Sequence, residues 1–297
     1  MSEQAATFGR ELPVAAVRRG PGRAVRLKRL VANNPLGVVG AALIGLLLLT
    51  AALANVLAPF DPSAQIARRL TGPGGEYLLG TDELGRDILS RIIYGTRISL
   101  YVGVVSVGIA LGIGGTLGLL AGYFGGWVDN LLMRLMDVMF AIPSLVLAIA
   151  ITGILGPNLR NAMIAIGLVY TPTFARVARG PVLSVVQHEY VAAARTVGAR
   201  HGRILLRHVL PNVTAPIIVQ TTLSLSTAIL TEAVLSFLGL GTQPPEPSWG
   251  TMLGTGRKFM ETAPWVAVFP GFAIMLAVLG FNLLGDGLRD ALDPRLR

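Results

Sequence analysis

The sequence predicts an all-α polytopic membrane protein with six transmembrane helices. One observation is its composition: of the 297 residues, 53% are hydrophobic and only 14% are charged, whereas about 25% of a typical soluble domain is charged. The second is a series of long intervals without charge. This composition excludes a disordered protein and most soluble enzymes. The absence of cysteine excludes disulfide scaffolds, thiolate metal sites and cysteine nucleophiles.

Five charge-free intervals locate five of the helices. A helix needs about 20 apolar residues to cross the ~30 Å hydrocarbon core of a bilayer, and these intervals are 22 to 31 residues long. They lie between Arg29 and Asp61, Arg97 and Asp129, Asp137 and Arg160, Arg207 and Glu232, and Glu261 and Asp286. The first interval predicts a helix over residues 36–58. Its apolar run exceeds the roughly 7–15 residues of a signal peptide, so we expect an uncleaved anchor.

A sixth helix is predicted over residues 161–174, where the apolar pattern is weaker. Pro172 interrupts the segment, and Arg176 and Arg179 follow it. We expect these arginines to reach toward the cytoplasmic lipid headgroups, because long basic side chains near a helix end can snorkel.

The positions of the basic residues predict that both termini are cytoplasmic. In this orientation 17 of the 25 Lys and Arg residues lie inside and 8 lie outside, as the positive-inside rule requires. The chain then has five parts. They are a basic cytoplasmic segment (1–35), the first helix (36–58), an extracytoplasmic loop (59–96), a five-helix core (97–290) and a cytoplasmic tail (291–297).

The outer loop carries clustered charges near the start of the second helix. Thr81 is predicted as a helix N-cap, and Asp82 and Glu83 suit the positive end of the helix dipole. Arg86 and Arg91 follow at a spacing that allows pairing with these carboxylates. A cation site is the alternative interpretation of the acidic cluster.

The sequence contains no site that could drive transport or hydrolysis. A phosphate-binding loop of the form G-x-x-x-x-G-K-[ST] is absent, so the chain is not expected to hold ATP by itself. Glu232 is the only carboxylate well inside a predicted span, whereas ion-coupled carriers usually have several ionisable groups there. His188, His201 and His208 share one cytoplasmic stretch without an H-E-x-x-H motif. The sequence therefore describes a membrane path that depends on an external source of energy.

The predicted cytoplasmic segment 188–212 is the candidate docking site for a partner that supplies this energy. Glu189 opens a helix. Ala192, Ala193 and Ala194 then form a surface of small side chains that allows close approach of another protein, as between packed helices.

The end of this segment is predicted from its glycine and proline. Gly198 suits a left-handed C-cap. A second helix is expected from about His201 to Pro211, where the next span opens. From the residues alone, a docking surface for a partner and an amphipathic hairpin lying on anionic lipid remain equally supported.

This segment resembles the EAA loop of ABC importer permeases. The family pattern is Glu-Ala-Ala, three residues, Gly, nine residues, Ile, one residue and Leu-Pro. The matching residues are Ala192-Ala193-Ala194, Gly198, His208 and Leu210-Pro211, at the family spacing. Ala192 replaces the usual glutamate and His208 the usual isoleucine. The first departure removes a salt bridge to the ATPase, for which the nearby Glu189 is the candidate substitute.

Four other segments resemble the C-type permease subunit of dipeptide, oligopeptide and nickel importers. They are residues 79–87 with Ser90-Arg91 and Tyr94-Gly95, residues 133–137 with 142–144, residues 235–250, and residues 281–290. Together with the EAA loop they cover nearly the whole chain from residue 36, in the order of the family.

The resemblance implies a type I ABC importer permease fold in the bacterial cytoplasmic (inner) membrane. It implies a heterodimeric pore made with a sister permease, two cytoplasmic ABC ATPase subunits and an extracytoplasmic substrate-binding protein. ATP and Mg²⁺ would bind to the partner ATPases, and no cofactor would bind to this chain. The chain would have no catalytic residue and no nucleic-acid partner. The residues of the ATPase-coupling loop would be Glu189, Ala192, Ala193, Ala194, Gly198, Leu210 and Pro211.

Di- or oligopeptides are the expected substrates. A nickel importer of the same family is the alternative, although no polar cluster resembles a nickel site, because the three histidines are cytoplasmic. An ion-coupled secondary carrier is a further alternative, against which the spacing of the EAA loop argues.

Two outer features are candidates for the translocation path or the outer gate. Glu232 either lines the path for a peptide amino group or a metal ion, or faces the sister subunit or outer water. The loop around Pro244, Pro245 and Trp249 contains three prolines that stiffen it. It is expected to form part of the outer gate or the docking face for the binding protein, or simply to tie two helices together.

Overall fold

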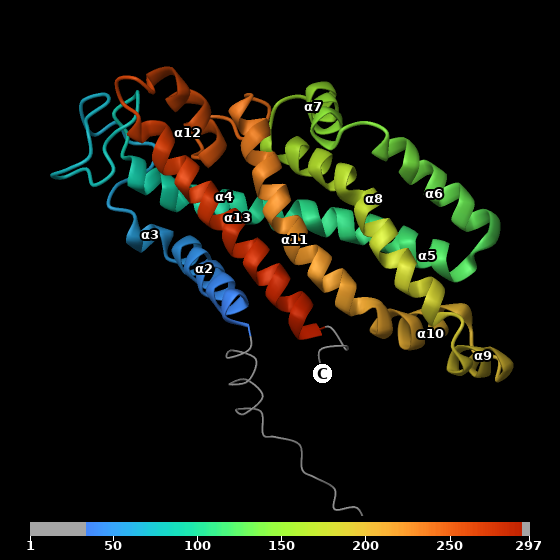
Figure 1. Ribbon diagram of the computed structural model, residues 1–297. Coiled ribbons are helices and arrows are strands. Elements are labelled where there is room, and N and C mark those ends of the chain that lie inside the picture. The colour runs from blue at the N-terminus through green and yellow to red at the C-terminus, as the bar shows by residue number, and fades with distance from the viewer. Residues whose placement is uncertain (1–33, 293–297) are drawn as a thin grey trace, which may run out of the picture. The chain divides into compact units, whose positions relative to one another are not determined.

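The computed structural model describes residues 34–292, which form helices and their connections (Figure 1). The predicted basic segment and tail lie almost entirely outside the described residues. The helices are α2 (Pro35–Ala52), α3 (Ala54–Leu57), α4 (Ile88–Ala110), α5 (Thr116–Phe124), α6 (Gly126–Phe140), α7 (Ser144–Leu155), α8 (Leu159–Val185), α9 (Glu189–Thr196), α10 (His201–Ile204), α11 (Leu210–Phe237), α12 (Trp249–Gly256) and α13 (Trp265–Leu292). Single π-helical turns, Leu111–Gly115 and Leu205–Val209, join α4 to α5 and α10 to α11, and a 3₁₀ turn, Arg257–Phe259, follows α12.

The first helix, α2, begins at a proline and packs tightly against α13. Pro35 is favoured at the first helical position, and the side chain of Asn34 accepts a hydrogen bond from an N–H of the first turn at 2.9 Å. Glycine allows the close approach, since a Cβ atom on Gly40 would lie 2.4 Å from the backbone nitrogen of Leu284. Small residues serve this purpose between membrane helices.

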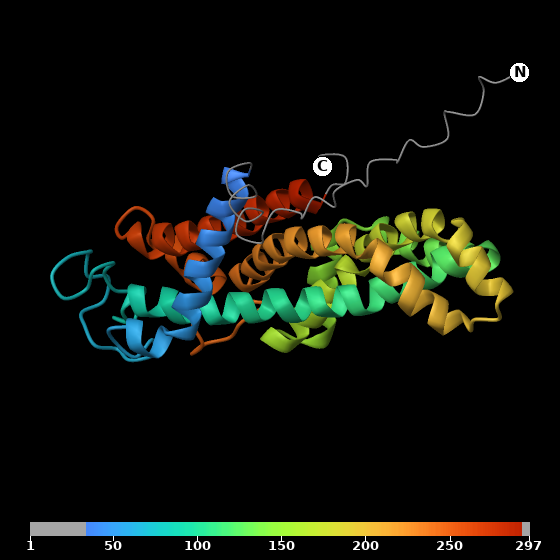
Figure 2. The same cartoon turned by 90° about the horizontal axis from the view of Figure 1, so that it is seen from below.

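The second long helix runs without interruption through α4 and α5 (Figure 2). It begins at Ile88, inside the predicted outer loop 59–96. Asp87, and not Thr81, is its N-cap, with the Asp87 carboxylate accepting a 2.7 Å hydrogen bond from the Ser90 N–H. The predicted N-cap is wrong because the chain between Thr81 and Asp87 forms a turn closed by an antiparallel bridge.

The predicted single helix between Asp137 and Arg160 is instead a bent pair. The axes of α6 and α7 meet at 87°. Pro143 lies in the break, where its missing N–H and its steric effect on the preceding residue prevent the helix from continuing.

Helix α8 extends well beyond the predicted segment 161–174 and stays continuous through Pro172 and Pro181. It packs on the long α4–α5 helix at glycines of the latter. A Cβ atom on Gly114 would lie 2.2 Å from the carbonyl oxygen of Thr171.

The two arginines of α8 bind carboxylates of α6. Arg176 pairs with Asp137 at 2.6 Å, and Arg179 pairs with Asp129 at 2.5 Å. The prediction that they reach toward lipid headgroups did not include these partners within the chain. Ion pairs within the chain hold α6 against α8.

The second helix predicted in the segment 188–212 does not end at Pro211. One helix of 37 residues extends from His201 to Phe237, with Pro211 in the first turn of α11. The π-helical turn just before it accommodates the proline ring, since such turns relax the regular ladder of hydrogen bonds.

Four of the described helices are long and apolar enough to cross a membrane, and the bent pair α6–α7 would make a fifth. The four are α2, α4 with α5, α10 with α11, and α13. Helix α8 is not among them. Between α4, α8 and α11 lies an apolar core that includes Val102, Ile166 and Leu235.

Candidate functional site

The segment 188–212, predicted to be cytoplasmic, folds into a helical hairpin, α9 and α10, with one anchored face and one free face. The anchored face joins α8 and α11 in one apolar cluster of buried side chains, among them Val182, Val191, Ile204 and Val213. On the free face Ala192 and Ala193 are exposed, and Ala194 is half-buried. The hairpin is thus held firmly against the membrane helices while its smallest side chains stay accessible.

Gly198 ends α9 in the left-handed conformation that the sequence predicts. Its φ is +79°, and the following Ala199 N–H donates to the carbonyl of Ala194 at 3.0 Å. A Cβ atom at Gly198 would meet nothing within 4 Å. The backbone conformation therefore favours glycine at this position, whereas the open surroundings would leave room for a larger side chain.

The other residues of the predicted coupling loop lie at the two ends of the hairpin. Glu189 is exposed in the first turn of α9, and its carboxylate has no ion pair among the described residues. Leu210 is half-buried against the apolar cluster, and Pro211 is exposed. An accessible carboxylate thus lies one helical turn before the alanines.

A contact that the sequence did not reveal ties the hairpin to α5. The hydroxyl of Tyr123 lies 2.8 Å from Nδ1 of His201. The guanidinium of Arg195 lies 5.5 Å from the centre of the Tyr123 ring, a cation–π contact. Because 78 residues separate Tyr123 and His201, no local pattern could predict this contact.

The second candidate region lies at the opposite end of α11, around Glu232. Its carboxylate is 0% exposed. One oxygen, Oε1, accepts hydrogen bonds from the hydroxyls of Ser236 at 2.6 Å, Ser248 at 3.0 Å and Thr242 at 3.3 Å. In this structure the Glu232 carboxylate is therefore enclosed by the chain itself. It connects the end of α11 to the loop that follows.

The residues of the proline-containing loop separate into buried and exposed ones. Trp249 is buried, and its indole N–H donates to the carbonyl of Ile92 at 3.0 Å. Pro244 and Pro245 are exposed beside a cavity. Trp249 thus fixes the loop to α4, while the two prolines stay exposed.

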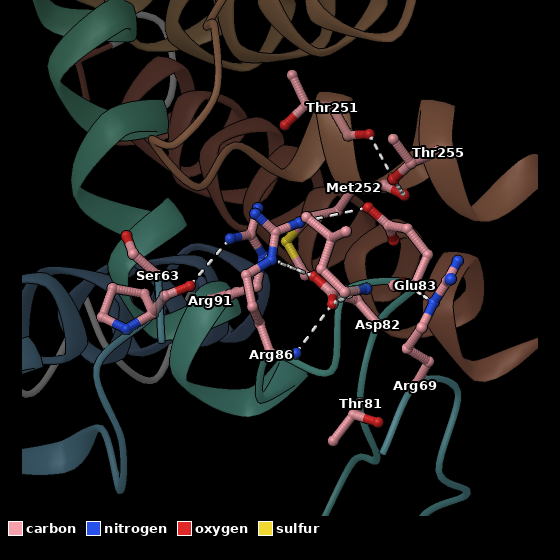
Figure 3. A network of polar contacts seen from close by, with 12 residues as sticks. Ser63, Arg69, Thr81, Asp82, Glu83, Arg86, Arg91, Thr251, Met252 and Thr255 are labelled. Carbon is pink, nitrogen blue, oxygen red and sulfur yellow. Dashed lines mark hydrogen bonds and ion pairs between the residues drawn. The ribbon is translucent and has the colours of Figure 1, made fainter. Parts of the chain in front are cut away.

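Four charged residues of the outer loop, Asp82, Glu83, Arg86 and Arg91, form one network of ion pairs (Figure 3). The Asp82 carboxylate pairs with Arg86 at 2.7 Å and with Arg91 at 3.5 Å, and Glu83 pairs with Arg86 at 3.3 Å. Arg91 also donates to the carbonyl of Pro62 at 2.9 Å. The predicted ion pairs are confirmed, and no cluster of metal-ligand side chains occurs among residues 34–292.

Comparison with known proteins places the hairpin and the helices around it in one family. Residues 114–297 match the family described as the binding-protein-dependent transport system inner membrane component. The chain belongs to this family. In addition, residues 27–73 match the N-terminal TM domain of oligopeptide transport permease C.

Curated relatives resemble the permease over most of its length. The dipeptide transport system permease protein DppC of Alkalihalophilus pseudofirmus is 52% identical over 262 residues, 86% of each chain. The di/tripeptide transport system permease protein DppC of Pseudomonas aeruginosa is 52% identical over 269 residues, 88% of this chain and 89% of that one. The glutathione transport system permease protein GsiD of Pectobacterium atrosepticum is 49% identical over 262 residues, 87% of each.

A solved structure shares the fold. It is an inward-facing conformation of the MetNI methionine ABC transporter, with a TM-score of 0.56 and 19% sequence identity over 69% of this permease and 98% of that chain. The chain is therefore a multi-pass inner-membrane permease of a bacterial ABC transporter, with an ABC importer permease fold. It is the membrane component and not the ATPase, and its family implies ATPase and binding-protein partners. The predicted family resemblance is confirmed.

Proposed function

We propose that the permease forms half of a translocation pore that imports di- or oligopeptides, delivered by an extracytoplasmic binding protein. The observation that carries this proposal is an identity of about half, over nearly nine tenths of the chain, with permeases named for dipeptide and di/tripeptide transport. Glutathione, named for a third relative, is itself a small peptide. The absence of a metal-ligand cluster among the described residues agrees with a peptide cargo.

The partners we propose are a sister permease that completes the pore and two ABC ATPase subunits that carry ATP and Mg²⁺. The accessible alanines Ala192 and Ala193 support docking of an ATPase on the hairpin, because a surface without bulky side chains permits close approach. The exposed Glu189 supports the salt bridge that Ala192 cannot make. Leu210 and Pro211 would transmit the movement into α11.

The topology we propose has six membrane crossings and cytoplasmic termini. The excess of basic residues on the predicted inner side supports this orientation. Helix α8 would supply the sixth crossing, shielded from lipid by its packing against α4, α5 and α11, which explains why its composition alone does not indicate a span.

Alternating access is the mechanism that this arrangement supports. Closure of the ATPase pair would move α9 and, through the buried cluster behind it, the helices α8 and α11. Coupling of this kind requires an element with two positions that both sites can bias. The apolar cluster beneath the hairpin supports such a role, since it makes the hairpin and the helix ends one packed unit.

Uptake of a radiolabelled dipeptide, a pentapeptide and nickel, in matched cells with and without this chain, tests the proposal. Loss of peptide uptake alone is the expected result. Loss of nickel uptake alone would show that the cargo is nickel and not a peptide. Unchanged uptake of all three would contradict the peptide assignment.

A further inference from the structure

A cavity of about 850 Å³ opens where α4, the start of α8 and the loop before α12 meet. Tyr101 and Ile109 of α4 line it, as do Arg160 of α8 and the loop residues Pro244 and Glu246. Pockets for small molecules commonly have about 300–1,000 Å³, so the space is large enough for a short peptide.

The cavity lies beside the middle of the long α4–α5 helix. Tyr101 and Ile109 are each about 20 Å from the nearer end of this helix, at 1.5 Å per residue. The whole helix is about 55 Å long, which exceeds the ~30 Å hydrocarbon core. The cavity also adjoins the first residues of α8 and the loop that follows α11. In the proposed topology it therefore lies toward the outer side of the translocation path.

Two side chains of opposite charge line this cavity without compensating each other. Arg160 and Glu246 are both exposed, and neither has an ion pair or a side-chain hydrogen bond with another residue of the described chain. Their charged atoms are more than 4 Å apart, since they form no ion pair. A few polar groups placed on the wall of a mainly apolar cavity commonly fix the orientation of a ligand.

The position of Arg160 in its helix makes the lack of a partner more informative. It is the second residue of the 27-residue helix α8, where the positive end of the helix dipole disfavours a cation. The helix end and the guanidinium together give one wall of the cavity a positive potential. Glu246 gives the loop side a negative one. This arrangement suits a ligand with one anionic and one cationic end.

We propose that Arg160 and Glu246 bind the two charged ends of a peptide during its passage through the membrane. Arg160 would hold the C-terminal carboxylate, for which the planar guanidinium is well suited, and Glu246 the N-terminal ammonium. The inference rests on the proposed peptide import and names the residues that contact the cargo.

The remainder of the wall agrees with a peptide cargo of varied sequence. Val105, Ile109 and Met163 provide apolar surface, which accepts many side chains without a directional requirement. The two ends of the backbone are the only charged groups that all linear peptides share. Arg160 and Glu246 would therefore recognise linear peptides in general, whatever the amino-acid sequence of the peptide.

Charge reversal tests this proposal with the complete transporter in cells. Arg160→Glu and Glu246→Arg are each expected to lower radiolabelled dipeptide uptake about tenfold or more, normalised to the amount of chain in the membrane. Both reversals together should restore most of the uptake, because the peptide can then bind in the opposite direction. Arg160→Lys and Glu246→Asp, which keep the charges, should retain uptake within about threefold.

A double neutral variant, Arg160→Gln with Glu246→Gln, separates ligand binding from a structural role. If the two residues bind the peptide ends, uptake by this double variant should be low. If they serve only a structural role toward each other, uptake should stay near the wild-type level when both charges are removed together. Uptake near the wild-type level in this variant, or no recovery in the double reversal at normal membrane abundance, would overturn the proposal.

Matched controls are Lys258→Gln and Glu261→Gln, which remove exposed charges away from the cavity and should leave uptake unchanged. The two proposals fail separately in this experiment. Absence of peptide uptake by the wild type would contradict peptide import, whereas normal uptake by wild type and all variants would contradict only the role of Arg160 and Glu246.

Discussion

Tyr123 and His201 join the helical hairpin to the end of the 37-residue helix formed by α4 and α5 through a 2.8 Å contact between Oη and Nδ1. Tyr123 also belongs to the apolar cluster that anchors the hairpin. Any force applied to α9 by a partner therefore reaches α5 directly, as well as α8 and α11 through the apolar cluster.

Tyr123→Phe is expected to lower peptide uptake per ATP hydrolysed by about two- to fivefold. The change removes only the hydroxyl, whose hydrogen bond contributes about 1 kcal/mol, and keeps the ring beneath Arg195. Uptake and ATP hydrolysis measured together in inverted and right-side-out membrane vesicles would show the loss. Tyr77→Phe in the outer loop is the control, and an equal effect of both changes would contradict the role of the contact.

Substitution of Gly198 should be far more harmful than substitution of Gly202. Gly198 has a φ of +79° and Gly202 does not have a positive φ, while both have open space around a new Cβ atom. Alanine at Gly198 should cost about 1 kcal/mol through backbone strain, asparagine less, and Gly198→Trp should abolish uptake at normal membrane abundance. Thermal unfolding of Gly198→Ala and Gly202→Ala in detergent checks the strain, and normal uptake by Gly198→Trp would remove the coupling role.

Ala193→Trp should prevent the ATPase subunits from co-purifying with the permease. The indole would stand on the exposed surface where close approach needs a small side chain, and it would disturb no internal contact. Leu206→Trp is the matched control, because a large side chain that is 70% exposed already stands there. Retention of the ATPases by Ala193→Trp would show that they dock elsewhere.

Glu232→Ala should lower the melting temperature more than Glu232→Gln. Alanine leaves the hydroxyls of Ser236, Thr242 and Ser248 without their acceptor in a buried site, at about 1–3 kcal/mol for an unsatisfied group. Glutamine keeps an acceptor oxygen at the position of Oε1. Scanning fluorimetry of the purified permease would measure the difference. Equal melting temperatures for the two variants would show that the carboxylate does not hold the loop.

Asp82→Asn should destabilise the outer loop strongly, since it leaves Arg86 and Arg91 buried without their shared anion. Breaking a buried ion pair costs about 3–5 kcal/mol, which corresponds to a fall in melting temperature of about 10 °C. Glu76→Gln, at an exposed position of the same loop, should have little effect. A melting temperature of Asp82→Asn within about 2 °C of the wild type would contradict this account.

The sequence predicted most of the helices because a span must be long and apolar, whatever surrounds it. It could not distinguish the two prolines that matter most for the fold. Pro143 breaks a helix, whereas Pro172 is tolerated inside α8, where tight packing against α4 and α5 holds the helix together and the neighbouring Thr171 hydroxyl donates to the carbonyl of Gly167. That difference depends on neighbours that are distant in sequence.

The residues of the candidate site also differ in whether the sequence could predict their surroundings. The C-cap at Gly198 follows from local backbone chemistry, and so the sequence predicted it. The environment of Glu232 does not follow from local chemistry, because Thr242 and Ser248 come from a loop that folds back onto α11. Arg160 and Glu246, 86 residues apart, become a pair of opposite charges only when the cavity brings them together.

The uninterrupted helix from His201 to Phe237 has a consequence for how the two ends of the permease communicate. Within it, α11 has 28 residues and is about 42 Å long, and a tilt of about 5° around its centre displaces each end by about 2 Å in opposite directions. One end carries the hairpin, and the other end carries Glu232 with the loop that it holds. Rotation of this one rigid body would therefore move the cavity wall at Glu246 in antiphase with the hairpin, with no relay of side-chain rearrangements in between.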